Sequence, residues 1–148
     1  MNLDVILNMT SPYNLKRFTD AQESRFSIAL NEIKNGRKQS HWMWFIFPQI
    51  AGLGFSEMSK LYAINDINEA SLYLAHPVLG KRLIEISKAL LDVEGKTASQ
   101  VFGSPDDMKL KSCMTLFSSL ENTNPVFEAI LAKYFGGTKD AKTLQLIK

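Results

Sequence analysis

Apolar residues recur along most of the chain at intervals of three and four positions, which is the spacing of one face of an amphipathic helix. One such stripe consists of Phe26, Ala29, Leu30 and Ile33, and Asn35-Gly36 follows it as a typical helix end. The stretches that fit the pattern are 15–22, 26–33, 41–47, 57–64, 66–75, 77–93, 97–102, 105–120, 125–134 and 140–147. Several of them span only one or two turns, so we expect about eight helices of unequal length.

Strands are not predicted, because no stretch alternates apolar and polar residues between hairpin turns. Frequent interruptions and unequal helix lengths favour an all-α orthogonal bundle over a regular four-helix coiled bundle. A chain of 148 residues is one domain on the usual size prior. We therefore expect a single helical domain over 12–148, preceded by a loose N-terminal arm at 1–11, where the pattern is weak.

Serine and proline mark the expected starts of several helices. Ser11-Pro12, Ser40 and Ser56 each precede an apolar run in the manner of an N-cap, and Ser104-Pro105 is followed by two acidic residues. Apolar side chains of these helices are expected to face the core. They include Met58, Leu61 and Tyr62 in the stretch 57–64, and Met108, Met114, Phe117 and Leu120 in the stretch after Pro105.

The run from His41 to Pro48 is the most aromatic part of the chain and contains both tryptophans. We expect it at the centre of the domain, with its few polar groups facing one cavity or held by hydrogen bonds. Trp42 and Trp44 differ by two positions, so on a helix they point to widely separated faces. Either both are core anchors whose N–H groups find partners, or one is in the core and the other forms a pocket wall.

Composition and charge narrow the class of function. The chain has 17 basic and 15 acidic residues, so it has no long-range field to attract a nucleic acid polymer. The single cysteine, Cys113, excludes an intramolecular disulfide and lies in an apolar pattern as a packed thiol. Without a signal-like start or a run of about eighteen apolar residues, we expect a cytoplasmic protein with no membrane partner, present as a monomer or a homodimer.

Two histidines and one basic cluster are the first candidates for chemistry. His41 and His76 are the only histidines, and neither is spaced from a second ligand as a metal site requires, so we expect no metal and no cofactor. His41 either forms hydrogen bonds in the core or faces a polar cavity. Lys34, Arg37 and Lys38 form either a solvated helix end or an anion site.

Several longer motifs carry a resemblance to a known family. They are Pro12-Tyr13-Asn14-Leu15-x-Arg17-Phe18, Gly36-Arg37-Lys38-x-Ser40-His41-Trp42-Met43-Trp44-Phe45-Ile46-Phe47-Pro48-Gln49, Tyr73-Leu74-x-His76-Pro77-x-Leu79-Gly80-x-Arg82-Leu83 and Phe102-Gly103-x-x-Asp106-x-x-Lys109-Leu110. From Pro12 to Leu146 the chain resembles the bacterial family catalogued as domain of unknown function 1810, whose members are often labelled calpastatin. The resemblance implies a mostly helical single domain and no assigned activity. Calpastatin is a disordered protein, whereas this composition is that of a packed domain.

Polar residues stand inside these otherwise apolar motifs, where core packing does not require them, so they form either a buried network or one pocket. The first hypothesis is binding of a small anionic ligand, such as a nucleotide or an ADP-ribose-like molecule. Its candidate binding residues are Arg17, Gln22, Lys38, His41, Trp42, Trp44, Gln49 and Lys109. The second is a hydrolase or glycosidase that uses His41 or Asp106 as the acid–base group. The third is an interaction protein whose aromatic stretch supports a homodimer.

Overall fold

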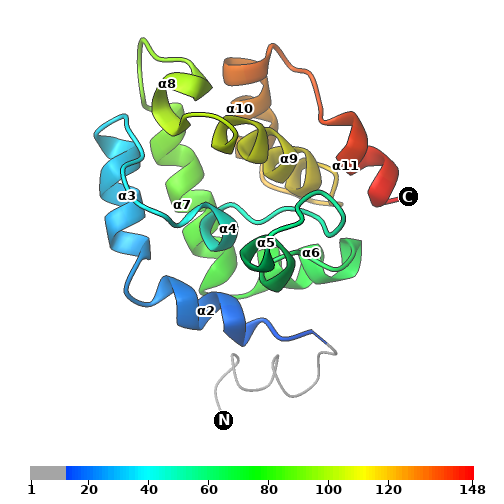
Figure 1. The fold of residues 1–148 in the computed structure, drawn as a ribbon. Helices are drawn as coiled ribbons and strands as arrows, with labels where there is room; N and C mark the ends of the chain where they lie inside the picture. The colour runs from blue at the N-terminus through cyan, green and yellow to red at the C-terminus, as the bar shows by residue number, and fades with distance from the viewer. Residues whose placement is uncertain (1–12) are drawn as a thin grey trace.

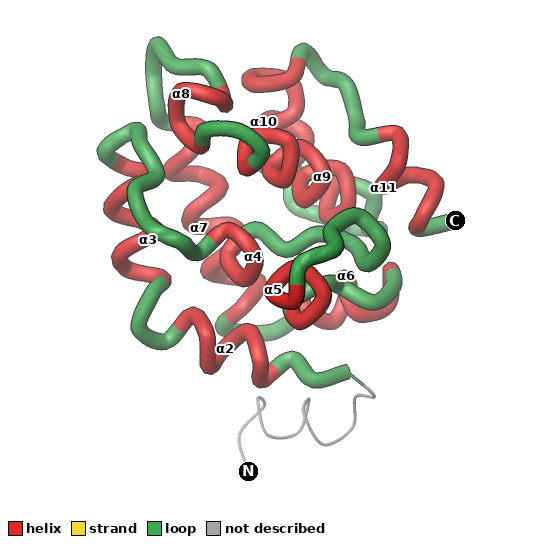
Figure 2. Tube along the Cα trace, in the orientation of Figure 1, coloured by secondary structure: helices red, strands yellow, loops and turns green. Residues whose placement is uncertain are grey.

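Ten helices form within residues 13–148, the part of the chain that this computed structural model describes (Figures 1 and 2). They are α2 (Lys16–Gln22), α3 (Phe26–Lys34), α4 (Met43–Ile46), α5 (Glu57–Leu61), α6 (Ile67–Ala75), α7 (Leu79–Leu91), α8 (Ala98–Phe102), α9 (Asp106–Ser118), α10 (Val126–Phe135) and α11 (Ala141–Leu146). The only extended pairing in this range is an isolated bridge between Ile50 and Ile64. The prediction of an all-α single domain is therefore confirmed. The expected arm at 1–11 and the start signal Ser11-Pro12 lie outside the described residues.

The two longest helices of this range, α7 and α9, form the centre of the molecule. Helix α7 packs against α3, α6 and α10, and α9 packs against α6, α8, α10 and α11. Figure 1 shows the helices crossing at steep angles instead of running parallel, which is the predicted orthogonal arrangement. Between residues 13 and 148, no helix has the length and apolar character needed to cross a membrane.

Aromatic rings join the elements of the core in two groups. Trp42, Phe47 and Phe102 pack together at ring-centroid distances between 5.8 and 6.4 Å, which attaches α4 to α8. In the second group, Tyr73 lies 5.0 Å from Phe18 and 5.5 Å from Phe117. Such offset and edge-to-face pairs add to the burial of apolar area. The aromatic stretch is thus in the core, as its composition predicted.

The thiol of Cys113 is fully buried in the core, on α9. Burial raises the pKa of this thiol well above its ordinary value. A thiol that stays protonated in an apolar environment is a poor nucleophile. The prediction of a packed cysteine is confirmed.

Glu32 on α3 fixes the turn that leads into α4. Its carboxylate accepts hydrogen bonds from the backbone N–H groups of Gln39 and Ser40, from the Ser40 hydroxyl and from the Trp42 indole. The predicted N-cap role of Ser40 is therefore wrong, since its hydroxyl is bonded to Glu32 and not to the start of α4. Helix α4 is also shorter than the predicted 41–47, because this turn continues through Trp42.

Two other predicted helix starts differ in outcome. Ser56 caps α5, and its hydroxyl accepts a hydrogen bond from the backbone N–H of Ser59, as expected. Ser104 does not cap α9, whose N-cap position is Pro105 and has no side-chain hydrogen bond. The cap, proline and acid signal therefore located the helix correctly but assigned the wrong role to the serine.

Three apolar side chains that we expected in the core lie at the surface. Met58 is 37% exposed, Leu61 53% and Met108 49%. Helix α5 ends at Leu61, three residues earlier than predicted, because the backbone of Ile64 bonds to the segment after α4. The helical spacing was right for Met58 and Leu61, but α5 is too short and too peripheral to bury them. Met108 lies in the first turn of α9, where the inward positions begin with Leu110.

Candidate functional site

The chain after α5 returns alongside the segment that follows α4, and this pairing forms one wall of a cleft. The backbone N–H of Ile64 donates to the carbonyl of Gln49 at 2.8 Å, and the N–H of Ala51 donates to the carbonyl of Ile64 at 2.8 Å. Pro48 ends α4 and starts this extended segment. Two segments that are separated by α5 in the sequence are thereby held side by side.

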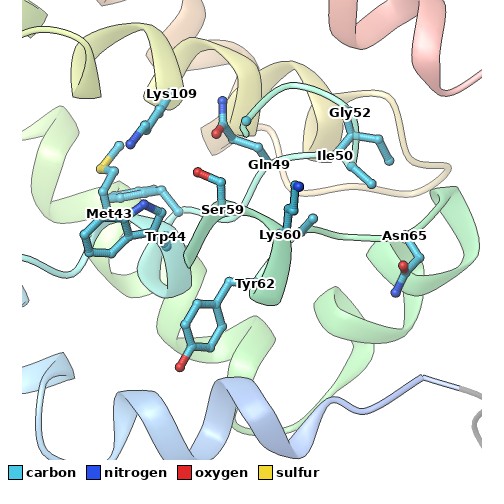
Figure 3. Close-up of a pocket in the computed structure, with 14 residues that line it drawn as sticks. Met43, Trp44, Gln49, Ile50, Gly52, Ser59, Lys60, Tyr62, Asn65 and Lys109 are labelled. Atoms are coloured by element: carbon cyan, nitrogen blue, oxygen red, sulfur yellow. The ribbon is translucent and has the colours of Figure 1, made fainter. Parts of the chain in front are cut away.

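The cleft has a volume of about 230 Å³ and lies between α4, α5 and the first turn of α9 (Figure 3). It is lined by Met43, Trp44, Phe47, Gln49, Ile50, Ala51, Gly52, Gly54, Ser59, Lys60, Tyr62, Ala63, Asn65 and Lys109. None of these residues is acidic, and two are lysines. A mostly apolar cleft with a few polar groups and a positive charge is suited to a small anionic ligand.

Trp44 and Lys109 form one end of the cleft. The ammonium group of Lys109 lies 5.3 Å from the centre of the Trp44 ring, within the range of a cation–π interaction. Figure 3 shows Lys109 reaching from α9 towards Trp44 on α4. Lys109 also forms an ion pair with Asp106 at 3.4 Å, one turn earlier on α9. The cation is thus held at the cleft by a ring and by a carboxylate outside the lining.

The middle of the cleft presents side chains with hydrogen-bonding groups. Gln49 and Ser59 lie there, with the ammonium group of Lys60 beside them (Figure 3). Within the described residues, the Gln49 amide has no side-chain hydrogen bond, so both its donor and its acceptor are available to a ligand. The ring of Tyr62 points away from the cleft and packs against Phe45 and Phe18.

Close packing fixes the loop at the far end of the cleft. Gly52 has a φ of +104°, and a Cβ atom there would lie 3.2 Å from the side chain of Leu146 on α11. A Cβ atom on Gly54 would lie 2.4 Å from that of Ser59. Both positions therefore require glycine, and the loop lies against α11 on one side and α5 on the other.

Of the residues that we predicted to bind a ligand, Trp44, Gln49 and Lys109 line this cleft. Trp42 does not, because it is fully buried and its indole N–H donates to Glu32 at 2.9 Å. Of the two alternatives left open for the tryptophans, the structure has the second: Trp42 is in the core and Trp44 lies in the cleft wall.

Arg17 and Gln22 belong to buried networks away from the cleft. Arg17 forms an ion pair at 2.9 Å with the fully buried carboxylate of Glu69. Gln22 donates to the carbonyl of Phe45 at 2.8 Å and to the hydroxyl of Tyr73 at 3.0 Å. For these two residues the structure realises the buried-network alternative and not the pocket.

The two acid–base candidates also lie outside the cleft lining. His41 is exposed, so the core alternative does not apply to it, and it is not among the residues that line the cleft. Its position follows from the turn that Glu32 fixes, which directs Trp42 inward and leaves His41 outside. Asp106 pairs with Lys38 at 3.0 Å and with Lys109 at 3.4 Å.

Lys60, Ser59 and Asn65 line the cleft but were not among the predicted site residues. Sequence patterns did not single them out, because an exposed helix lysine and a serine beside a cap are common on any surface. The structural roles of Glu32 and Glu69 were also missed. The groups that bind their carboxylates come close only when the chain is folded.

Comparison with known proteins agrees with the fold and the motifs. The family model described as "Protein of unknown function (DUF1810)" matches residues 12–147. The crystal structure of the conserved hypothetical protein Rv1873 from Mycobacterium tuberculosis is similar, with 44% sequence identity, a TM-score of 0.90, and coverage of 93% of this chain and 98% of that one. No curated protein matches the chain. A model that spans almost the whole chain establishes membership, and the chain belongs to the DUF1810 family.

Proposed function

We propose that this protein binds a small anionic ligand of the nucleotide or ADP-ribose-like class in the cleft between α4, α5 and α9. The observation that carries the proposal is the lining itself: an aromatic face at Trp44, ammonium groups at Lys60 and Lys109, and no carboxylate among the described lining residues. An aromatic ring beside cations suits a planar base with an attached phosphate. The apolar residues of the lining would exclude water from the base.

The position of the charges supports an anion over a neutral ligand. Lys109 is 22% exposed and is balanced by Asp106, whereas Lys60 has no carboxylate partner among the described residues. A phosphate placed between the two ammonium groups would therefore interact with the uncompensated charge of Lys60. It would share the charge of Lys109 with Asp106. The free amide of Gln49 can donate to the phosphate or accept from a sugar hydroxyl.

Binding is favoured over hydrolysis by the location of the acid–base candidates. A general acid or base must reach the reacting atom within about 3 Å or through one water molecule. His41 and Asp106 are both outside the cleft lining, and Asp106 is engaged by two lysines. The geometry therefore offers recognition groups at the cleft but not the two catalytic groups that the hydrolase hypothesis named.

Tryptophan fluorescence provides a direct test, because Trp44 is half-buried at the cleft and Trp42 is sealed in the core. We expect AMP, ADP, ATP or ADP-ribose to change the emission of the protein, and Trp44→Phe to remove that change. Lys60→Ala should weaken binding about fivefold, the effect of losing one solvent-exposed charge contact. Lys81→Ala, an exposed lysine of α7 away from the cleft, is the matched control and should bind as the wild type does.

Isothermal titration decides the outcome independently of fluorescence. Absence of binding to every member of this nucleotide panel at millimolar concentration would contradict the proposal. Binding that persists unchanged in a Trp44→Phe, Lys60→Ala double variant would place the ligand elsewhere and would also contradict it.

A further inference from the structure

A second hollow lies between the turn after α3 and the segment that contains α8, and Lys38 is one of its lining residues. Its volume is about 500 Å³, and it is lined by Arg37, Lys38 and Lys96 together with neutral residues that include Gly95 and Gly103. We call it the basic groove, because three of these residues are cations and none is acidic. It shares no lining residue with the cleft.

The walls of the basic groove are tied together by hydrogen bonds. The ammonium group of Lys96 donates to the carbonyl of Gly36 at 2.9 Å, and the backbone N–H of Lys38 donates to the carbonyl of Val101 at 2.8 Å. A capping box between Thr97 and Gln100 fixes the start of α8. These contacts hold two segments that are about sixty residues apart in the sequence, so the groove is formed before any ligand arrives.

The cations of the basic groove differ in how far they are already neutralised. Arg37 is exposed and has no carboxylate partner within the described residues. Lys96 is bonded to a carbonyl, which satisfies one of its N–H groups, and it pairs with no carboxylate among residues 13–148. Lys38 pairs with Asp106 at 3.0 Å and lies 5.2 Å from the Trp42 ring. The groove therefore contains two uncompensated charges and one shared charge.

Asp106 stands between the two hollows. One carboxylate oxygen contacts Lys38, which lines the basic groove, and the other contacts Lys109, which lines the cleft. A single negative charge thus reduces the attraction of both hollows for an anion. When an anion binds Lys109 in the cleft, the ion pair between Lys109 and Asp106 weakens and the pair between Asp106 and Lys38 becomes stronger. Lys38 then attracts an anion in the groove less strongly.

We propose that the basic groove is a second anion site, that it takes a phosphate-bearing small molecule, and that Asp106 couples it antagonistically to the cleft. The site itself is independent of the proposed function, whereas the coupling depends on it. Phosphate is the class that fits, because an arginine and two lysines around an open hollow that is more polar than apolar supply charge and hydrogen-bond donors.

Titration with inorganic pyrophosphate at constant ionic strength, followed by ¹⁵N–¹H correlation spectra, separates the two hollows. Amide signals of Gly95 and Gly103 report on the groove, and those of Gly52 and Gly54 report on the cleft. We expect saturable shifts of the groove signals at millimolar pyrophosphate or below. Arg37→Ala removes an exposed side chain and should weaken the groove site about fivefold, whereas Lys81→Ala, at a residue that lines neither hollow, should leave it unchanged.

Asp106→Asn tests the coupling. Removing the shared carboxylate should tighten pyrophosphate binding about threefold at the groove. It should also tighten AMP binding at the cleft if the proposed function holds. Saturating AMP should weaken the groove site in the wild type and weaken it less in Asp106→Asn.

Three results would overturn this inference. They are groove signals that do not respond to pyrophosphate, a response that Arg37→Ala leaves intact, and groove affinity that falls in Asp106→Asn. A cleft that binds no nucleotide while the groove signals still respond would refute the proposed function and the coupling, but would support the groove as a site.

Discussion

Glu32 is the side chain that holds the turn between α3 and the aromatic stretch in place. Its carboxylate accepts four hydrogen bonds from residues 39–42, including one from the buried indole of Trp42. Burial acts to raise the pKa of Glu32, but the hydrogen bonds from Ser40, Gln39 and Trp42 outweigh it and lower the pKa to about 2. A carboxylate with a depressed pKa in the folded state stabilises the fold only while it is ionised.

Glu32→Gln should therefore destabilise the protein at neutral pH by about 1 to 2 kcal/mol, allowing for the partial exposure of the group. The pH dependence of this stabilisation follows from the lowered pKa. The contribution of Glu32 to the free energy of unfolding is complete above about pH 4.5 and is lost as the pH falls towards about 2. Urea unfolding of wild type and variant between pH 7 and pH 2 measures this difference. A gap in stability that stays constant down to pH 2 would show that the charge of Glu32 is not responsible.

Helix crossings are decided by contacts that the helical pattern does not reveal, and Gly80 is an example. It is the second residue of α7, and a Cβ atom there would lie 1.9 Å from the backbone carbonyl oxygen of Leu74 on α6. The sequence predicted both helices and the break at His76-Pro77, but it gave no reason for glycine inside a helix. The reason is the close approach of two backbones at the turn between α6 and α7.

Gly80→Ala should destabilise the protein by about 2 kcal/mol or more, although alanine is the better helix former. The added methyl group forces α6 and α7 apart, because its nearest neighbour is backbone and cannot rotate away. Thermal unfolding measures the loss. Lys81→Ala, the next residue of α7, is exposed and should change stability by less than about 0.5 kcal/mol; a small effect at both positions would contradict this account of the crossing.

At the scale of the whole molecule, Arg17 connects three parts of the chain. Its guanidinium group pairs with Glu69 on α6 and donates to the carbonyls of Leu61 and Ala63, which flank the end of α5. Glu69 is fully buried, and it also accepts from the backbone and side-chain N–H groups of Asn65. The residue that we predicted to bind a ligand instead holds α2 against the segment that forms one wall of the cleft.

Arg17→Met should cost about 3 to 5 kcal/mol, because it leaves a buried carboxylate without its cation. Adding Glu69→Gln removes that uncompensated charge and should recover part of the loss. The neighbouring pair between Lys16 and Asp20 is a matched control, since both side chains are more than 60% exposed. Lys16→Ala should be nearly neutral in chemical denaturation, and a loss as large as that of Arg17→Met would contradict the role given to burial.

Local pattern determined the class of fold and most helix positions. Stripes such as Phe26 to Ile33 and endings such as Asn35-Gly36 are local properties, because helix spacing and left-handed caps depend on neighbours in the sequence. The same reasoning placed the aromatic stretch in the core, but it left open whether Trp42 and Trp44 share one environment, and the fold decided that they do not. Local pattern did not predict that α5 lies at the periphery with Leu61 exposed.

Only the tertiary structure decided which polar residues meet. Gln49 and Lys109 are sixty residues apart and line one cleft because the fold brings Lys109 of α9 over the Trp44 ring of α4, whereas Arg17 pairs with Glu69 and His41 is exposed. Spacing along a chain sets the direction of a side chain on its own helix, but the partner that it finds depends on how separate helices cross. The sequence by itself therefore determined the helices and their buried faces, and the packing of those helices determined the cleft, the basic groove and the carboxylate between them.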